Sequence, residues 1–397
     1  MSVRKRVWKS RSGEMKEAWV VDYVDQHGDR HLKTFAKKRD ADAHHAIVGV
    51  AVRAGTHTAD SKSVTAAKAA ELWLASCDAA GLERTTIAAY RQHVALRIVP
   101  VLGALRLSQL TVPLVRGFED RLAADGYSPV MVRKTRRLLG SLIADAQERG
   151  LVAQNVVRSL RTSRRGKDAR IERRRNGKLK VGVDIPTPAE MRAIVAALAT
   201  IDEAPRFRPL LLTAIFTGLR ASELRGLKWA DVDLKRGEVH VCQRADRYGK
   251  IGRTKSEAGE RTVPLPPLVV AALREHKLAC PNGALGLAFP NSKDGVDHRN
   301  SIVERGLHPA QVAAGVTKQG KNGRPVAKYA GLHALRHFYA SWCINRRVDG
   351  GLELPLKVVQ ARLGHASIQM TADTYGHLFP RGDDGAELAA AEKAFFG

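Results

Sequence analysis

The chain contains 397 residues, of which 44% are hydrophobic and 27% charged, and its 66 Lys and Arg residues exceed its 40 Asp and Glu residues. This length predicts two or three domains, and the composition excludes a wholly disordered chain. The formal net charge of +26 indicates a polyanionic partner, either nucleic acid or an anionic membrane. The longest apolar run, residues 209–216, is too short to cross a bilayer, and no apolar segment follows the basic N-terminus as in a secretory signal. We therefore expect a cytoplasmic protein that binds nucleic acid.

The cysteines and histidines predict no metal or cofactor site. His44 and His45 are adjacent, but the sequence offers no third ligand nearby. The four cysteines are far apart and form no CxxC pair, as is typical of reduced thiols. They are Cys77, Cys242, Cys280 and Cys343.

Residues 1–60 are the first predicted domain, a small β-rich module. The predicted elements are a strand at 19–24, a turn at 26–29, a return strand at 31–35, a third strand at 3–9 and a helix at 37–52. So small a sheet is expected to keep one wet, basic face, and such a face can enter a DNA groove. A dimerisation or purely structural module is the alternative.

Residues 64–160 predict helices throughout. Ser63 or Thr65 is expected to cap the first helix, and Ser128 precedes a proline that begins the last long one. One face of that last helix carries an apolar stripe. The opposite face is crowded with basic residues, which in so basic a chain favours a surface that faces phosphates. These residues are Arg133, Lys134, Arg136 and Arg137.

A basic linker is predicted at residues 161–182. Between residues 161 and 180 there are ten basic residues against two acidic ones and almost nothing apolar, so this stretch cannot fold by burial. Its charge suits a phosphate backbone, around which two domains could close like a clamp. Thr187 is then expected to cap a helix that opens the last domain, residues 183–397.

The first of five chemically suggestive segments is TGLRASEL at residues 217–224. It follows an apolar helix, so Gly218 is expected to provide a tight turn. Arg220 is then placed at the start of the next helix, a position that suits a phosphate. Glu223 is expected to cap or position that turn.

The other four segments contribute a lysine, two histidines, an arginine and a tyrosine. Lys255 is expected at a β-turn tip between strands at 238–244 and 261–265. His333 and Arg336 are three residues apart and share one helix face, and His337 is interpreted as helix packing. His365 and Tyr375 follow in LGHAS and TYGH. Each of these residues alone is more often a solvated or packed side chain than a catalyst.

Taken in this order, the five segments resemble the tyrosine recombinase (phage integrase) family over about 160 residues. The motif TKSEAGER departs mildly from the family pattern, in which TKT is commoner, but it keeps the lysine. The resemblance implies a multidomain, mainly α fold with small β elements. Its parts are an arm-type DNA-binding module (1–60), a helical core-binding domain (64–160), the linker (161–182) and a mixed α/β catalytic domain with a C-terminal tail helix (183–397).

The resemblance also implies the chemistry. Tyr375 attacks a DNA phosphodiester and leaves a 3′-phosphotyrosyl link and a 5′-hydroxyl, with neither metal nor cofactor. The remaining implied roles are phosphate binding for Arg220 and Arg336, general acid for Lys255, general acid/base toward the tyrosine for His333, and a phosphate hydrogen bond for His365.

The implied partners are double-stranded DNA attachment sites, a homotetramer on that DNA, and accessory DNA-bending or directionality proteins, in the nucleoid of a bacterial host. An integrase of a phage or mobile element is the preferred interpretation. The alternatives are a resolvase, a type IB topoisomerase with the same residues, and a DNA-binding regulator that does not cleave. The apolar tail at 386–396 favours a recombinase over a topoisomerase, because it suits docking onto a neighbouring protomer. Packing of this helix within its own chain is the alternative.

Overall fold

The computed structural model describes residues 1–9, 14–55, 57–60, 63–160, 178–201, 206–254, 256–281, 283–320, 322–380 and 384–397. The chain divides into two compact units, Met1–Arg164 and Arg165–Gly397. Most of the predicted linker, residues 161–177, lies outside the described residues. None of the helices in the described part of the chain combines the length and the apolar character that a membrane span needs.

The first unit begins with a β-module. Strands β1 (Ser2–Lys9), β2 (Met15–Val24) and β3 (Arg30–Phe35) form an antiparallel sheet in the order β1-β2-β3, and helix α1 (Lys38–Arg53) follows. The predicted strands and helix are thus confirmed. Val21 and Tyr23 on β2 share a small core with Ala41 and Val48 on α1.

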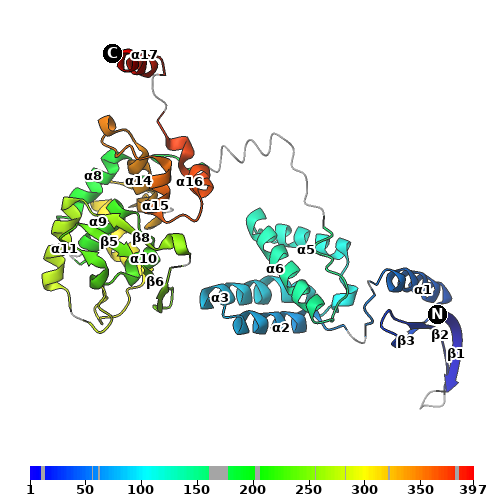
Figure 1. Ribbon diagram of the computed structural model, residues 1–397. Coiled ribbons are helices and arrows are strands. Elements are labelled where there is room, and N and C mark those ends of the chain that lie inside the picture. The colour runs from blue at the N-terminus through cyan, green and yellow to red at the C-terminus, as the bar shows by residue number, and fades with distance from the viewer. Residues whose placement is uncertain are drawn as a thin grey trace. The chain divides into compact units, whose positions relative to one another are not determined.

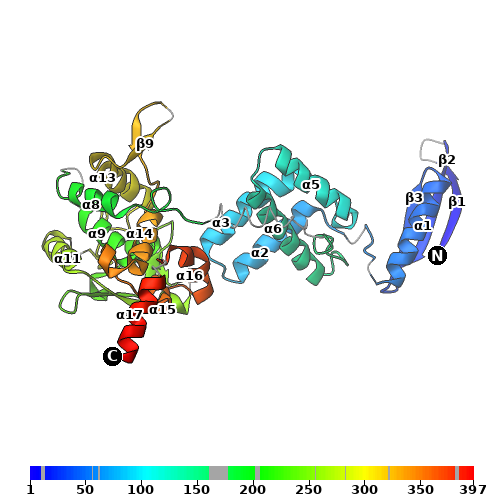
Figure 2. The same ribbon diagram turned by 90° about the horizontal axis from the view of Figure 1, so that it is seen from above.

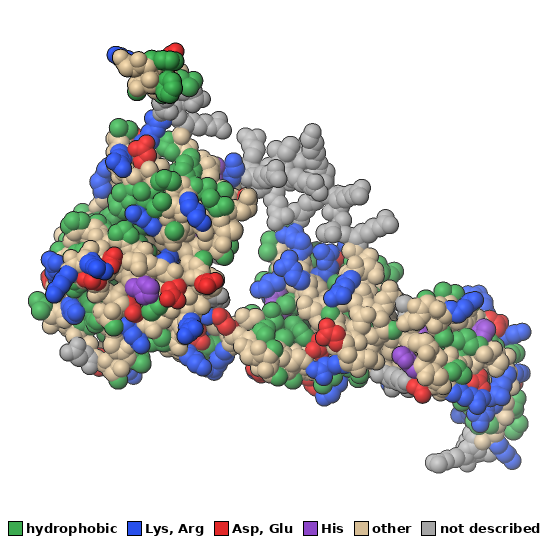
Figure 3. Space-filling model, viewed as in Figure 1, with side chains coloured by type: hydrophobic (Ala, Val, Ile, Leu, Met, Phe, Trp, Pro, Cys, Tyr) green, Lys and Arg blue, Asp and Glu red, His purple; other side chains and the backbone are tan. Residues whose placement is uncertain are grey.

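The face of this sheet opposite α1 is basic. Because successive residues of a strand point to opposite faces, the partners of Val20 and Ala18, which are Arg4 and Arg6, lie on the face away from Val21. Arg30 pairs with Val24 and lies on that same face. Lys and Arg side chains gather over this module in Figure 3. We call Arg4, Arg6 and Arg30 the outer arginines.

The rest of the first unit is a helical bundle. Its elements are α2 (Ala66–Ala79), α3 (Arg84–His93), the π-helical turn η1 (Val94–Ile98), α4 (Val99–Leu102), the 3-10 turn η2 (Leu107–Gln109), α5 (Val112–Ala124) and α6 (Pro129–Glu148). The side chains of Thr65 and Ser128 accept hydrogen bonds from backbone N–H groups at the starts of α2 and α6, so both are N-caps as predicted. The bundle encloses its own core, in which Phe118, Leu139 and Leu142 are buried.

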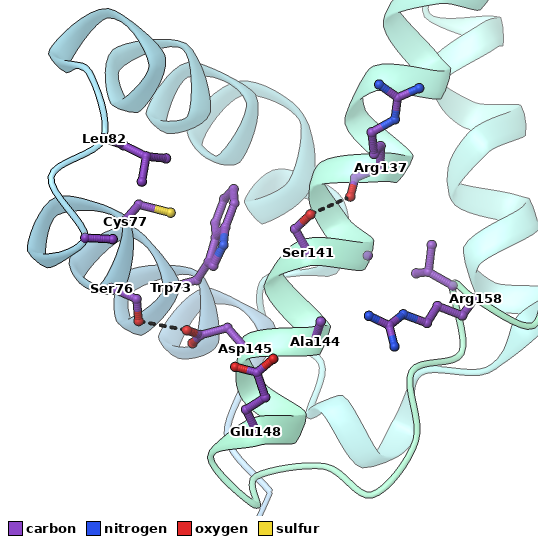
Figure 4. A pocket seen from close by; sticks show the side chains of 13 residues that line it. Trp73, Ser76, Cys77, Leu82, Arg137, Ser141, Ala144, Asp145, Glu148 and Arg158 are labelled. Carbon is purple, nitrogen blue, oxygen red and sulfur yellow. Dashed lines mark hydrogen bonds between the residues drawn. The ribbon is translucent and has the colours of Figure 1, made fainter.

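A pocket of about 550 Å³ lies between α2 and α6 (Figure 4). Trp73 and Leu82 form its apolar wall, while Ser76 donates a hydrogen bond of 2.7 Å to Asp145 at its edge. None of the five sequence segments contributes to its lining. The pocket is therefore a feature of the bundle and not of the predicted catalytic residues.

The second unit is a mixed α/β domain (Figures 1 and 2). Its longer helices are α8 (Pro188–Ala197), α9 (Arg208–Thr217), α11 (Pro267–Ala279), α14 (His333–Ile344), α15 (Leu356–Leu363), α16 (Ile368–Tyr375) and α17 (Asp384–Phe396). Its shorter helical segments are α10 (Ala221–Gly226), η3 (Trp229–Asp231), η4 (Glu257–Gly259), α12 (Arg299–Ile302), η5 (Val303–Leu307), α13 (His308–Ala313), η6 (Arg347–Asp349) and η7 (Gly376–Leu378).

Three small antiparallel sheets are found among the described residues of this unit. Their strands are β4 (Val232–Asp233), β5 (Glu238–Val241) and β8 (Arg261–Pro264) in the first, β6 (Gln243–Ala245) and β7 (Ile251–Arg253) in the second, and β9 (Thr317–Gln319) and β10 (Pro325–Ala327) in the third. The single strand predicted at 238–244 is wrong in one respect. It divides at Cys242 into β5 and β6, which pair with different strands.

Helix α9 is the centre of the core. Every residue from Pro209 to Ile215 is buried, as the largely apolar run predicts for a helix that is covered on all sides. Helices α14 and α11 pack on α9, and α15 in turn contacts α14 and α16. This packing brings the C-terminal ends of α9, α15 and α16 to α14, which carries His333 and Arg336. The multidomain, mainly helical fold with small sheets predicted from the sequence is therefore confirmed.

Candidate active site

Glu223 holds two arginines at the start of α10. Arg220 is the N-cap residue, and its backbone N–H and side-chain Nη1 donate to the Glu223 carboxylate at 2.8 and 2.7 Å. Arg261, the first residue of β8, donates to the same carboxylate through Nη2 at 2.9 Å. Burial alone would raise the pKa of Glu223, but the hydrogen bond and charge of Arg261 and the charge of Arg220 outweigh it and lower that pKa. The carboxylate stays ionised and orients both guanidinium groups, so the predicted capping role of Glu223 is confirmed.

Arg336 is held by the backbone of two other segments. Only 2% of this residue is exposed. Its Nη1 and Nη2 donate to the carbonyl oxygens of Gly218 and Leu363, both at 2.6 Å. Burial and the nearby Arg220 charge lower the pKa of Arg336 to about 10, so the side chain remains charged at neutral pH. A planar guanidinium fixed in this way presents its remaining N–H groups in one direction.

Two glycines in the left-handed conformation make these contacts possible. Gly218 ends α9 with φ 61°, and Gly364 ends α15 with φ 62°. Tyr339 occupies the space that a Cβ at Gly218 would need, and a Cβ at Gly364 would lie 2.8 Å from Nη1 of Arg261. Both positions therefore exclude any side chain on conformational and steric grounds. The turn predicted at Gly218 is confirmed.

His365 follows the second of these glycines and is buried. Its Nδ1 lies 2.9 Å from Oγ1 of Thr371, and the carbonyl of the preceding Gly364 accepts a hydrogen bond of 2.9 Å from Nη2 of Arg220. Burial, followed by the charges of Arg336 and Arg220, lowers the pKa of His365 to about 4. A neutral imidazole thus lies beside two cationic arginines.

Tyr375 is the last residue of α16 and is only 1% exposed. Its ring lies parallel to that of His365, with the ring centroids 6.3 Å apart. Its hydroxyl lies 2.8 Å from Nδ1 of His337. Burial raises the pKa of Tyr375 to about 12, against the opposing effect of Arg336 and Arg220. The phenol is therefore protonated at neutral pH.

The interpretation of His337 as helix packing is wrong. His337 contacts the Tyr375 hydroxyl directly, while the ring of His333 packs edge-on against His337 at 4.7 Å between centroids. His333 itself is exposed, and partial desolvation followed by Arg336 and Arg220 lowers its pKa. The signal for His337 was present in the sequence, because it lies four residues after His333 on the same helix.

Lys255 lies outside the described residues. Its neighbours Thr254 and Ser256 are described, and Oγ1 of Thr254 donates to the carbonyl of Ser256 at 3.1 Å. Arg261 donates to the carbonyl of Gly259 in the same loop at 2.8 Å. Arg261 thus links this loop to the Glu223 cluster, although its sequence position indicates only the start of a strand.

The structure connects the other five predicted site residues. Arg220 bonds the residue before His365, Arg336 bonds both the TGLR turn and the end of α15, and the ring of Tyr375 faces that of His365. His333 joins through its ring contact with His337. Among the described residues, no group of three or more His, Cys, Asp or Glu side chains could hold a metal ion. The arrangement offers two fixed cations beside a buried phenol, which suits an anionic ester that a tyrosine attacks.

Comparison with known proteins agrees with this arrangement. The family model described as the phage integrase family matches residues 186–381. A tyrosine recombinase XerC-like protein of Caldanaerobacter subterraneus subsp. tengcongensis is 26% identical over 378 residues, which is 90% of each chain. Tyrosine recombinase XerC of Xylella fastidiosa is 30% identical over 261 residues, covering 62% of this chain and 78% of the relative.

Solved structures show the same fold. The Tn1549 transposon integrase in complex with a circular intermediate DNA superposes with a TM-score of 0.59 at 16% identity, over 82% of this chain and 99% of that one. A lambda integrase tetramer bound to a Holliday junction gives a TM-score of 0.54 at 16% identity, over 91% and 95%. The chain belongs to the phage integrase family of tyrosine recombinases. It is accordingly an enzyme of site-specific DNA recombination.

Proposed function

We propose that Tyr375 is the nucleophile that cleaves DNA in this recombinase. The observation that carries the proposal is the burial of the phenol beside Arg336 and Arg220, whose charges both act on it. A phosphodiester is anionic and resists attack, and its transition state gathers more negative charge on the non-bridging oxygens. Fixed guanidinium groups stabilise that charge without reorganising.

The remaining roles follow from position. Arg220 and Arg336 bind the non-bridging oxygens, and His365 donates a hydrogen bond to the same phosphate. Lys255 protonates the departing 5′-oxygen, and His333, exposed at the rim, exchanges protons with the reacting groups. The phosphotyrosyl link conserves the energy of the ester, so a second 5′-hydroxyl can reseal the strand without ATP.

We further propose that the reaction integrates and excises a phage or other mobile element in the cytoplasm of a bacterial host. The relatives that support this include the prophage integrase IntR of Escherichia coli, which is 27% identical over 174 residues. In this proposal residues 1–60 bind arm-type DNA through the outer arginines, and residues 64–160 bind the core site. Residues 161–182 follow the phosphate backbone between the two domains, and accessory DNA-bending or directionality proteins assist.

A homotetramer on DNA is part of the same proposal. Leu388, Phe395 and Phe396 on α17 are 70%, 82% and 80% exposed, an unusual state for large apolar side chains at the end of a chain. Docking of α17 on a neighbouring protomer would cover them. The tetramer of lambda integrase on a Holliday junction supports an assembly of this kind.

The test uses nicked duplexes from DNA that flanks the gene, where an attachment site is expected. Wild-type protein and Tyr375→Phe are incubated with these duplexes after binding is confirmed, and the products are separated on a denaturing gel. An SDS-resistant adduct that only the wild type forms supports the proposal, and an adduct with Tyr375→Phe refutes it. Tight binding with no adduct from either protein would favour a DNA-binding regulator. Relaxation of supercoiled DNA that lacks any attachment site would favour a topoisomerase, and recombination restricted to sites on one molecule would favour a resolvase.

A further inference from the structure

The contact between His337 and Tyr375 is the feature of the site that the roles above do not use. It joins α14 to the last residue of α16 through a distance of 2.8 Å from Nδ1 to the phenolic oxygen. The two rings are 5.7 Å apart at an interplanar angle of 60°, so the imidazole edge points at the hydroxyl. No other hydrogen-bond partner of this hydroxyl is found among the described residues.

The direction of this hydrogen bond follows from the charge state of each partner. Tyr375 is protonated at neutral pH, as its raised pKa of about 12 requires. Burial, then the charges of His333 and Arg336, lower the pKa of His337 to about 4, and only Asp184 opposes them, so the imidazole is neutral. A buried phenol without an acceptor would lose a hydrogen bond to water and gain nothing. The phenol therefore donates, and the unprotonated Nδ1 accepts.

We propose that His337 is the general base of strand cleavage, which takes the proton of Tyr375 as the phenolic oxygen attacks the phosphate. This inference rests on the proposed role of Tyr375 as nucleophile. His333 was expected to act toward the tyrosine, but its ring packs against that of His337 and its side chain is exposed. A base must lie within hydrogen-bond reach of the proton that it removes, and His337 alone of the two histidines meets that requirement here.

The proton and electron balance of the step is complete. The phenolic O–H bond breaks and its proton passes to Nδ1 of His337 while the bond from oxygen to phosphorus forms. The bond from phosphorus to the 5′-oxygen breaks, and that oxygen takes a proton from Lys255, the proposed general acid. In resealing, the imidazolium returns its proton to the departing phenolic oxygen.

The basicity of the His337 imidazole depends on whether DNA is bound. The groups that face His337 are His333 and Arg336 on its own helix, Asp184 ahead of α8, and Tyr375 on α16. Arg336 is also a proposed phosphate ligand, so a bound phosphate partly neutralises one of the charges that oppose protonation of the imidazole. His337 thus becomes a stronger base once DNA is in place, and the buried phenol stays protonated without it.

The experiment separates proton removal from leaving-group protonation. Full-length wild type, His337→Ala, His337→Asn and Lys255→Ala are given a nicked attachment-site duplex with either a normal ester or a 5′-bridging sulfur at the scissile position. A thiolate departs without a proton, so the sulfur substrate relieves the need for the acid only. Adduct formation is timed at saturating DNA, with thermal unfolding and DNA affinity as controls for folding and His240→Asn, an exposed histidine on β5, as the matched control.

We expect His337→Ala to slow adduct formation on both substrates by the same factor, on the order of 100-fold, as loss of a general base does. Asparagine at this position can accept a hydrogen bond but not a proton, so His337→Asn should fold and bind DNA normally and remain slow. Lys255→Ala should be slow on the ester and fast on the sulfur substrate. A wild-type rate for either His337 variant, or recovery of these variants on the sulfur substrate, overturns the inference. An adduct from Tyr375→Phe in the same assay would overturn the proposed function itself.

Discussion

Glu223 and Asp22 each bind two arginines, but the two clusters differ in their exposure to water. In the second unit, Glu223 joins Arg220 and Arg261, and the side chains of Glu223 and Arg261 are only 3% and 6% exposed. In the β-module, Asp22 joins Arg4 and Arg30, whose side chains are 60% and 65% exposed. The two clusters contain the same chemical groups, but their arginines differ in exposure to water.

The difference explains what each cluster is suited to do. Removing charges from water is costly, so the buried cluster exists only because each group has fixed partners, and those partners hold the guanidinium groups in place. Exposed pairs gain little energy and are screened by salt, so their arginines can leave the aspartate for another anion. The buried cluster suits a transition state of defined geometry. The exposed cluster suits DNA binding in which an arginine exchanges one phosphate for another.

The largest effect is expected from Arg336→Lys. Lysine keeps the positive charge but cannot donate to the carbonyls of Gly218 and Leu363 while also presenting donors to a phosphate. We expect adduct formation at saturating DNA to fall by about 100- to 1000-fold, the usual result of losing a fixed transition-state donor. Affinity for the attachment-site duplex should change by less than about tenfold, because many other phosphate contacts hold DNA. An adduct rate near that of the wild type would mean that charge alone is sufficient at this position.

The next effect concerns stability, through Glu223→Gln. Loss of the carboxylate leaves Arg261 charged and buried without its partner, which typically costs about 3–5 kcal/mol of the free energy of unfolding. The pKa of Glu223 is lowered in the folded protein, so its stabilisation is complete above its ordinary pKa and is lost as the pH falls through the lowered value. Denaturant titrations between about pH 3 and pH 7 should therefore show a steeper loss of stability toward low pH for the wild type than for the variant. Parallel curves would show that Glu223 carries no such linkage.

A smaller effect is expected from neutralising the outer arginines. With Arg4, Arg6 and Arg30 all changed to Gln, binding to arm-type DNA should weaken, and the slope of log affinity against log salt should decrease by about one for each phosphate that the sheet no longer binds. Cleavage of a saturating core-site duplex should stay at the wild-type rate. Glutamine at Lys68, Arg91 and Arg121, three exposed bundle positions, removes the same number of charges and is the matched control. An equal loss of arm-site affinity in that control would assign the effect to net charge and not to the sheet face.

The sequence predicts much of this fold because its signals are local. The N-caps at Thr65 and Ser128 and the alternation along β2 each depend on a few neighbouring residues. The apolar run of α9 also reveals a central helix without further information. The division of one predicted strand at Cys242 was not predictable, because it depends on which distant strand pairs with each half.

The site divides in the same way. The family resemblance selects Arg220, Arg336 and Tyr375, and the turn at Gly218 follows from one glycine. Arg261 carries no local signal, because its contact with Glu223 joins residues 38 positions apart in the sequence. His337 has the spacing of a site residue, but only the packing of α16 on its neighbours decides which of two histidines on α14 faces the tyrosine.

The smallest effect is expected from Asp22→Asn, the counterpart of Glu223→Gln in the β-module. The change removes the same kind of charge as Glu223→Gln, from between two arginines of the same kind. Hydrogen bonding to Arg30 holds the pKa of Asp22 below its ordinary value. The Asp22 side chain is 11% exposed, but water solvates most of both arginines, so they need no partner when the charge is gone. The free energy of unfolding should therefore match that of the wild type within error. Arm-site affinity at low salt should rise slightly, because Arg4 and Arg30 no longer have to break their ion pairs with the Asp22 carboxylate before they bind phosphate. The gain should vanish at high salt, where the pairs are already screened. A loss of stability comparable to that of Glu223→Gln would mean that exposure does not distinguish the two clusters.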